Sequence, residues 1–398
     1  MNGYIKMTAN TNSRKDLLKS VKRIVIKIGS GVLTAADGLN LPVMDDLTAD
    51  ISALKKSGIE VVLVSSGAIA AGIKKLRMTH RPRSVSEQQA TAAVGQGDLI
   101  RSWENAFERH GHRVGQVLLT RDDLTHRRRY LNARNTIFTL LSWNIIPIIN
   151  ENDTVVVDEI KFGDNDNLSA MVTNLSEADF LINLTNIDGL FDKDPRDHKD
   201  ARLIQVVEKV DRKITQFAGA IPGFLGRGGM GSKIRAAKSV ALAGVPTLIA
   251  NGLKPGIIDR LFAGQPEGTL FLPEPVSLCS RKHWIAFTKS PKGEIIIDRG
   301  AEKAILENGK SLLPSGIKEV RGQFSVGNSV LLINEDGAPV AVGMVSYHSG
   351  NIKKIMGAKS SEIESILGFK HDDEVIHRNN LVLTAHMDEG DEACRLKI

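Results

Sequence analysis

The chain lacks three features that would place it outside the ordinary cytoplasmic proteins. It has two cysteines, Cys279 and Cys394, without the Cys or His neighbours of a zinc site. So few cysteines argue against a disulfide framework and predict a reducing cytoplasm. No run of about 18 apolar residues occurs, so no membrane span is expected. The polar start, Met1 to Ser20, has no apolar centre of a secretory signal.

The remaining composition is that of a globular protein able to form a core. Hydrophobic residues make up 42% and charged residues 25% of the chain. A length of 398 residues favours two domains over one. The net charge of +6 is a mild basic excess, which suits anionic ligands without indicating a nucleic-acid-binding protein.

The first two thirds of the chain alternate strand-like and helix-like segments. Short runs rich in β-branched residues are typical of buried strands, and they occupy residues 23–28, 60–64, 145–149 and 180–184. Between the first two, residues 43–56 carry apolar side chains at helical spacing and end before Gly58. This order predicts a parallel sheet with right-handed crossovers. Ligands of such sheets bind at the carboxyl ends of the strands.

The first predicted strand has a lysine near its end and is followed by several small residues. Lys27 is followed by Gly29, Ser30 and Gly31. Glycines after a strand let backbone N–H groups approach an anion, to which the lysine adds a positive charge. The alternative is an ordinary turn with an incidental lysine, although a lysine in a buried strand needs a partner. A dinucleotide fingerprint fits poorly, because Thr34 occupies the place of its third small residue.

A glycine-rich loop precedes a predicted helix that begins near Lys233. Residues 227–233 read Arg-Gly-Gly-Met-Gly-Ser-Lys, and such a loop at a helix N-terminus can cradle phosphate. The alternative is a flexible surface loop. A Walker A loop is excluded, because its lysine precedes Ser or Thr whereas Lys233 precedes Ile234. The loop therefore indicates a nucleotide kinase of another architecture.

Clusters of amide and carboxylate side chains follow the predicted strand 145–149. Residues 150–153 read Asn-Glu-Asn-Asp, and residues 163–167 read Gly-Asp-Asn-Asp-Asn. Either cluster alone is typical of a polar turn or helix cap, and the EF-hand spacing is absent after Asp164. Together they can hydrogen-bond the ammonium and carboxylate groups of an amino acid. A small-residue turn at residues 65–68 follows the second strand and lies at the same edge of the sheet.

Taken together, these segments resemble the amino acid kinase family. Its motifs appear in the family's order as KIGSGVL (27–33), SSGAI (65–69), INENDTV (149–155), KFGDNDNLSA (161–170), LTNIDGLFDKDPR (184–196) and GGMGSK (228–233). The resemblance covers residues 22–272. It implies an α/β fold, a three-layer α/β/α sandwich over residues 1–275, in place of a Rossmann dinucleotide fold.

The resemblance also implies an activity. Within the family, the chain is similar to members that use ATP and Mg²⁺ to phosphorylate the side-chain carboxylate of L-glutamate, the first step of proline biosynthesis. It further implies feedback inhibition by L-proline and a homo-oligomer, either a dimer or a tetramer. A carboxylate is already ionised at neutral pH, so no general base is required. Kinases of aspartate, carbamate, N-acetylglutamate or a nucleotide monophosphate are the alternatives within the family.

Residue roles are carried over from the family motif by motif, and no protein ligand for a metal is implied. The implied catalytic residues are Lys27, Lys233 and Asp166, with Asp166 orienting both lysines. The implied glutamate-binding residues are Ser66, Gly67, Asn150, Asp153, Asp164 and Asn165. The implied ATP-binding residues are Lys27, Gly29, Ser30, Thr185, Asn186, Arg227, Gly228, Gly229, Met230, Gly231, Ser232 and Lys233. Asn186 stands where the family usually has Asp.

The last third of the chain has a different pattern, with short strand candidates in place of alternating strands and helices. Short strand candidates at residues 295–297, 330–333 and 340–345 are separated by turns, and the turn at 334–337 predicts a hairpin. Residues 277–371 resemble a PUA domain, a small β-barrel known from RNA-modifying enzymes, and residues 372–398 form an acidic tail. An RNA-binding protein is the alternative from another class. An accessory barrel is favoured, because no aromatic stacking platform is evident.

Overall fold

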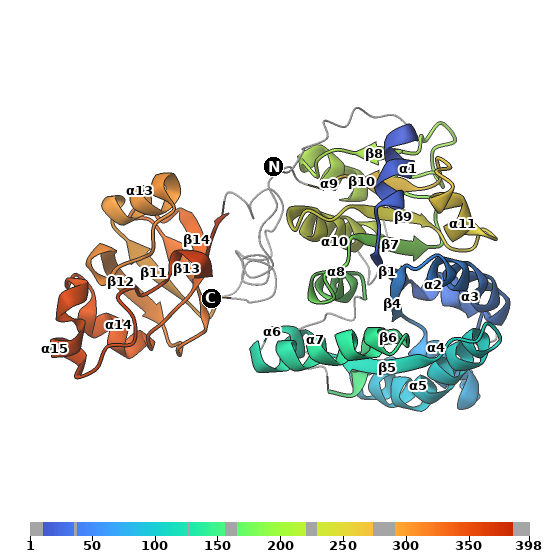
Figure 1. Cartoon of the computed structure of the whole chain (residues 1–398), viewed down its shortest axis with the longest axis horizontal. Coiled ribbons are helices and arrows are strands. Elements are labelled where there is room, and N and C mark those ends of the chain that lie inside the picture. The colour runs from blue at the N-terminus through green and yellow to red at the C-terminus, as the bar shows by residue number, and fades with distance from the viewer. Residues whose placement is uncertain are drawn as a thin grey trace. The chain divides into compact units, whose positions relative to one another are not determined.

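The chain folds into separate units, each with its own apolar core. The computed structural model describes residues 11–35, 38–125, 127–155, 165–219, 229–273 and 291–384 (Figure 1). The two compact units are Met1–Ser277 and Leu278–Ile398. Cys279, Cys394 and the acidic end of the tail lie outside the described residues.

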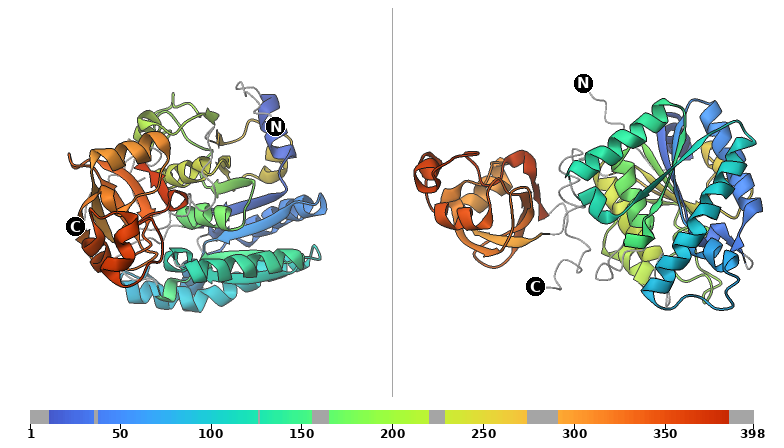
Figure 2. Two further views of the ribbon diagram at one scale, coloured as in Figure 1. Left: turned by 60° about the vertical axis from the view of Figure 1, so that its left-hand side comes forward. Right: turned by 90° about the horizontal axis from the view of Figure 1, so that it is seen from below.

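A mixed sheet runs through the middle of the first unit. In the described residues it has eight strands in the order β5-β6-β4-β1-β7-β9-β10-β8. Figure 1 labels these strands, and Figure 2 shows the same unit from two other directions. The strands from β5 to β9 run parallel, and β10 is antiparallel to β9. Their bounds are β1 Arg23–Ile28, β4 Glu60–Ser65, β5 Val114–Leu119, β6 Ile146–Glu151, β7 Phe180–Thr185, β8 Val206–Val207, β9 Thr247–Asn251 and β10 Thr269–Phe271. The predicted strands are confirmed as β1, β4, β6 and β7.

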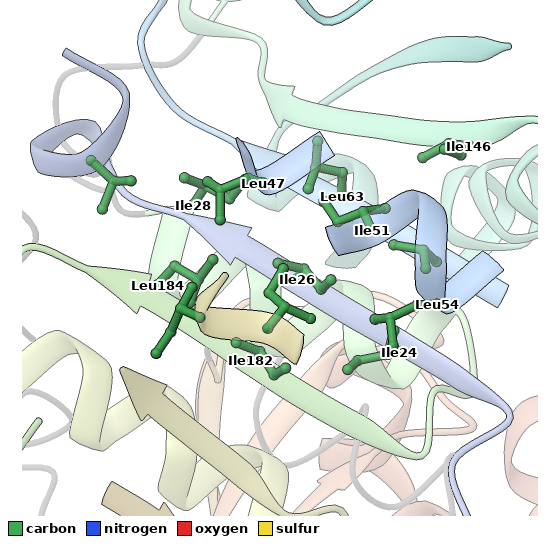
Figure 3. Close-up of a cluster of buried hydrophobic side chains, with 14 of the residues drawn as sticks. Ile24, Ile26, Ile28, Leu47, Ile51, Leu54, Leu63, Ile146, Ile182 and Leu184 are labelled. Atoms are coloured by element: carbon green, nitrogen blue, oxygen red, sulfur yellow. The ribbon is translucent and has the colours of Figure 1, made fainter. Parts of the chain in front are cut away.

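Helices pack on both faces of this sheet, which confirms the three-layer sandwich. Side chains alternate between the faces of a strand, so Ile24, Ile26 and Ile28 of β1 point to one face and Lys27 to the other. The isoleucines pack with α3 (Leu41–Lys56), α5 (Val85–Glu108) and α11 (Ile257–Phe262) in one apolar cluster (Figure 3). The Lys27 face is covered by α8 (Asn165–Leu175) and α10 (Met230–Leu242).

Two helices beside the turn that follows β4 cross at glycines. Helix α4 (Ala68–Lys75) begins at this turn and packs on α5. A Cβ atom added at Gly95 would lie 2.0 Å from Ala68 O and 2.2 Å from Gly72 N. The two backbones approach this closely only because Gly72 and Gly95 carry no side chain. The crossing therefore fixes where α4 begins.

Gly95→Ala is expected to lower the free energy of unfolding by about 2–3 kcal/mol, because the added methyl group forces α4 and α5 apart. Gly97→Ala is the matched control on the same helix, since nothing lies within 4 Å of its added Cβ atom. Alanine is the better helix former, so the control should gain up to about 1 kcal/mol. Urea unfolding measures both, and equal stabilities would contradict this close crossing.

The second unit is built on a smaller mixed sheet. In the described residues its strand order is β12-β11-β13-β14-β15. The strands are β11 Gly293–Ile297, β12 Ile317–Gly322, β13 Ser329–Ile333, β14 Pro339–Met344 and β15 Leu381–Leu383. The helices α13 (Arg299–Asn308), α14 (Ser349–Ile355) and α15 (Ile363–Leu367) accompany them. Around this sheet lies a separate apolar core that includes Tyr347.

The hairpin predicted in this unit is confirmed. Strands β13 and β14 are antiparallel, and the Asn334 side chain accepts hydrogen bonds from the backbone of Asp336 and Ala338 in the turn. The sheet also continues past residue 371, where the sequence placed the end of this domain. Strand β15 pairs with β14 because its apolar side chains are buried there. No helix in the described ranges is long and apolar enough to cross a membrane.

Candidate active site

The carboxyl ends of neighbouring strands bring the chemistry-bearing residues to one edge of the first sheet. Strands β4, β1 and β7 are parallel neighbours, so their ends lie side by side. Lys27 stands near the end of β1, opposite Val64 of β4 and Asn183 of β7. Helices α8 and α10 carry Asp166 and Lys233 in their first turns. Side chains from distant parts of the sequence therefore meet at this edge.

A buried aspartate joins the two lysines. Asp166 is 0% exposed, and Lys27 and Lys233 are 3% and 4% exposed. Lys27 Nζ donates to Asp166 Oδ1, and Lys233 Nζ donates to Asp166 Oδ2 at 3.1 Å. The Ser232 hydroxyl donates to the same Oδ2 at 2.6 Å. We call Lys27, Asp166, Ser232 and Lys233 the lysine–aspartate centre.

The lysine–aspartate centre carries a net positive charge. Burial alone would raise the pKa of Asp166, but the charges of Lys27 and Lys233 outweigh it and hold that pKa well below its usual range. Asp166 is therefore ionised at neutral pH and offsets only one of the two ammonium charges. The remaining charge suits an anion, such as a phosphoryl group, at the edge of the sheet.

A group of amides lies near the ends of β4 and β6. Asn165 Nδ2 lies 2.8 Å from Ser66 Oγ and 3.1 Å from Asn150 Oδ1. Asn150 Nδ2 donates to Gln96 Oε1 at 2.9 Å. Asn165 Oδ1 is buried and has no hydrogen-bond partner among the described residues. These four residues, which we call the amide cluster, can bind the polar groups of a small molecule.

Two further glutamate-binding candidates lie after these strands. Gly67 caps the N-terminus of α4 with a φ of 112°, a left-handed conformation that requires glycine. Asp153 begins the short 3-10 helix η1 (Asp153–Val155) after β6. Burial raises the pKa of Asp153 to about 6, although its own backbone N–H opposes the shift. A carboxylate of this kind gains from a cationic partner.

The ATP-binding candidates Gly29, Ser30 and Gly31 follow β1, and Thr185 and Asn186 lie at the end of β7 and directly after it. A Cβ atom added at Gly29 would lie 3.5 Å from Lys27 Nζ, and one added at Gly31 would lie 3.0 Å from the Asn186 side chain. Ser30 begins helix α2 (Ser30–Leu33), which follows β1. Thr185 Oγ1 lies 3.5 Å from Asn186 Oδ1. Glycine at position 31 therefore allows the close approach of the Asn186 side chain to the segment that follows β1.

The glycine-rich loop ends in helix α10, as expected. Gly229 is the N-cap residue, and Met230, Gly231 and Ser232 precede Lys233 in the first turn. The Met230 side chain is buried in an apolar cluster with Ile234, so its backbone alone can face a nucleotide. The candidates Asp164, Arg227 and Gly228 lie outside the described residues.

The motifs did not identify every residue of the site. Asn183 of β7 donates to Asp166 Oδ1 at 2.9 Å, and Gln96 of α5 belongs to the amide cluster. An asparagine within the apolar run FLINL was the signal for Asn183. Gln96 had no such signal, because it is one polar residue on an amphipathic helix.

Comparison with known proteins agrees with this geometry. The model of the amino acid kinase family matches residues 22–251, and that of the PUA domain matches residues 293–367. The Glutamate 5-kinase of Geobacter sulfurreducens is 54% identical over 371 residues, which are 93% of this chain and 100% of that protein. The Glutamate 5-kinase of Syntrophotalea carbinolica is 51% identical over 370 residues, which are 93% of this chain and 99% of that protein.

Solved structures offer a more distant likeness. The UMP kinase of Bacillus anthracis is 16% identical with a TM-score of 0.45, and the match covers 65% of this chain and 98% of that one. That likeness is too weak to add to the assignment. The family match, in contrast, spans more than half of the chain and includes the whole lysine–aspartate centre. The chain therefore belongs to the amino acid kinase family.

Proposed function

We propose that this chain transfers the γ-phosphoryl group of ATP to the side-chain carboxylate of L-glutamate. The products are ADP and L-glutamyl 5-phosphate, as in the first step of proline biosynthesis. The observation that carries the proposal is the buried lysine–aspartate centre, with its surplus positive charge at the sheet edge. The relatives named Glutamate 5-kinase, at 51% and 54% identity, support glutamate over other acceptors.

The transfer step needs positioning and charge rather than proton chemistry. A side-chain carboxylate oxygen of glutamate attacks the γ-phosphorus, and the bond to the bridging oxygen of ADP breaks. The electron pair of that bond leaves with ADP, and no proton has to be removed from the nucleophile. Lys27 and Lys233 neutralise the charge on the transferring group. Asp166 holds both ammonium groups in place through its two oxygens.

Glutamate would bind at the amide cluster. The unpartnered Asn165 Oδ1 and the Ser66 hydroxyl offer hydrogen bonds to its polar groups. Asp153 would pair with the α-ammonium group, because its half-buried carboxylate gains from a cation. Gly67, in the turn that follows β4, and Asp164 would complete this pocket.

ATP would bind along Gly29 to Gly31, Thr185 and the loop that leads into α10. The backbone N–H groups at the start of α10 suit phosphate oxygens. In the described ranges, no group of three His, Cys, Asp or Glu side chains is arranged to hold a metal, and Asp166 is engaged with lysines. Magnesium would therefore be held mainly by the phosphates of ATP, where it would offset their charge.

The test of this proposal is ATP turnover with glutamate and magnesium, with the acyl phosphate trapped by hydroxylamine. Aspartate and N-acetylglutamate serve as controls in the same assay. A hydroxamate that depends on glutamate is the expected result. If a control acceptor were turned over and glutamate were not, the assignment of glutamate as the substrate would fall while the kinase activity would stand. If no acceptor were turned over, both assignments would fall.

Asp153→Asn is expected to raise the glutamate KM about 10-fold or more with a smaller change in kcat, because a charge-assisted hydrogen bond contributes about 1.5–3 kcal/mol. The pKa of Asp153 is raised to about 6, so its carboxyl becomes neutral at lower pH. The glutamate KM of the unaltered chain should therefore rise as the pH falls below about 6. In Asp153→Asn this rise should be absent.

Asp50→Asn is the matched control for this pH dependence. Burial, with the nearby charge of Asp259, raises the pKa of Asp50 to about 6 as well. Asp50 lies on α3 and accepts a hydrogen bond from the Ile258 backbone at 2.9 Å, where it caps α11. Asp50→Asn should leave the glutamate KM and its pH dependence unchanged. A pH-dependent KM that survives in Asp153→Asn would point to a different glutamate pocket.

We further propose the regulation and assembly that the family resemblance implies. L-Proline would inhibit the reaction, and the chain would form a dimer or tetramer in the cytoplasm. Titration of turnover with proline, and the native mass in solution, test these points. RNA is the alternative partner of the PUA-like unit, and salt-sensitive RNA binding without ATP turnover would favour it.

A further inference from the structure

Asn183 is a polar residue within a strand that is otherwise apolar up to its final threonine. All residues of β7 are buried, and Asn183 is 1% exposed. It lies directly opposite Lys27 in the pairing of β7 with β1. Side chains opposite each other in neighbouring parallel strands point to the same face of a sheet. Asn183 therefore shares with Lys27 the face that α8 covers.

Asn183 contacts the lysine–aspartate centre directly. Its Nδ2 donates at 2.9 Å to Asp166 Oδ1, which also accepts from Lys27. On the other oxygen, Oδ2 accepts from Ser232 and Lys233. Each oxygen of the carboxylate is thus held by one lysine and one neutral donor. Together these contacts restrict rotation of the carboxylate, and with it the positions of the two ammonium groups.

The other end of the Asn183 side chain destabilises the fold. Asn183 Oδ1 is buried and has no hydrogen-bond partner among the residues that the structure describes. Such an atom gives up its bonds to water without replacement. An aliphatic side chain would suit this strand better. A locally unfavourable residue in contact with a catalytic centre points to a functional role.

We propose that Asn183 is a positioning residue for phosphoryl transfer, which holds Asp166 so that Lys27 and Lys233 converge on the transferring group. It would not touch the substrate, and its amide adds no charge that would cancel the positive charge of the centre. The inference rests on the proposed function where it concerns turnover. Its structural part, the ordering of the two lysines, is independent of the substrate.

Asn183→Leu is expected to lower kcat about 10-fold, with the KM for ATP and for glutamate changed less than about two-fold. The urea midpoint should stay equal or rise, because the unsatisfied Oδ1 is removed. Thr247→Val is the matched control: Thr247 of β9 is 1% exposed, and its Oγ1 also lacks a partner among the described residues. Thr247 lies opposite Leu181, at the start of both strands. This control should keep the native kcat.

Asn183→Asp distinguishes positioning of Asp166 from simple packing. Near pH 8 the introduced carboxylate would repel Asp166 and cancel the positive charge of the centre, so kcat should fall about 100-fold. As the pH falls, the two carboxyl groups share a proton and the donor to Asp166 is restored. With saturating glutamate, kcat should therefore recover towards acid pH in this variant alone. Native kcat in Asn183→Leu, or no acid recovery in Asn183→Asp, would overturn the inference.

Lysine side-chain NMR separates this inference from the proposed function. In chain labelled with ¹⁵N-lysine, the buried ammonium groups of Lys27 and Lys233 should give signals of slowly exchanging protons. Asn183→Leu should broaden these signals, and Thr247→Val should keep them. Unchanged signals in Asn183→Leu would overturn the inference even if the chain phosphorylates glutamate. Broadened signals in a chain that leaves glutamate untouched would support the inference and overturn the function.

Discussion

Asp166→Asn is expected to lower the free energy of unfolding by about 3–5 kcal/mol, because Lys27 and Lys233 would remain buried without a counter-charge. In the unaltered chain both ammonium groups pair with the Asp166 carboxylate, and Asp166 is 0% exposed. The same change should lower kcat about 100- to 1000-fold, because the lysines would no longer be held at the transferring group. Few single changes in this chain should affect both stability and rate so strongly.

Asp194→Asn is the control for this substitution. Asp194 is also buried, at 5% exposure, but its partner Arg196 has a side chain that is 60% exposed. Loss of that pair leaves a charge in water, so the cost should be below about 1 kcal/mol. Urea unfolding and hydroxamate formation measure both variants. A stable Asp166→Asn chain would show that the two lysines are not buried around this carboxylate.

The stability lost in Asp166→Asn should depend on pH. Lys27 and Lys233 hold the pKa of Asp166 below its usual range in the folded chain, against the effect of burial. The contribution of the carboxylate is therefore fully present above about pH 4, its unfolded pKa, and is lost as the pH falls further. The difference between the unaltered chain and Asp166→Asn should be constant at neutral pH and shrink in acid. A difference that grows in acid would contradict an ionised Asp166.

Lys27→Ala and Lys233→Ala are each expected to lower kcat about 100- to 1000-fold, because each removes a charge that would stabilise the transferring phosphoryl group in the proposed reaction. The glutamate KM should change much less, because in the proposed function glutamate would bind at the amide cluster and Asp153. Lys75→Ala is the control, since Lys75 pairs with Asp98 at 2.6 Å on the exposed side of α4. Steady-state kinetics of the three variants measures the effect. A normal kcat in either site variant would remove the phosphoryl-transfer role.

The strands β1, β4, β6 and β7 could be predicted from the sequence because their signals are local. The run RIVIKI is apolar at nearly every position, as expected for a strand covered on both faces. The same holds for the other strands predicted in the first unit. Strands β5, β8, β9, β10, β12 and β15 were missed. In the case of β15, three apolar residues in an acidic segment carry too little signal until β14 lies beside them.

Only the tertiary structure joins the residues of the site. Lys27 and Asp166 are separated by 139 positions, and Asp166 and Lys233 by 67. Their roles followed from the family resemblance, whereas their contact depends on how β1, α8 and α10 pack. Asn183 and Gln96 stayed unassigned for the same reason, because their hydrogen bonds cross between elements.

The sequence by itself determined the parallel part of the first sheet, the β-rich second unit and the motifs of a kinase, because apolar periodicity and short motifs depend on neighbouring residues. The antiparallel strand β10 was not predicted. The tertiary structure alone decided which side chains share a carboxylate, where α4 and α5 touch, and which amide oxygens stay unpaired. Those features depend on distances between elements, which side-chain packing sets and local sequence does not encode.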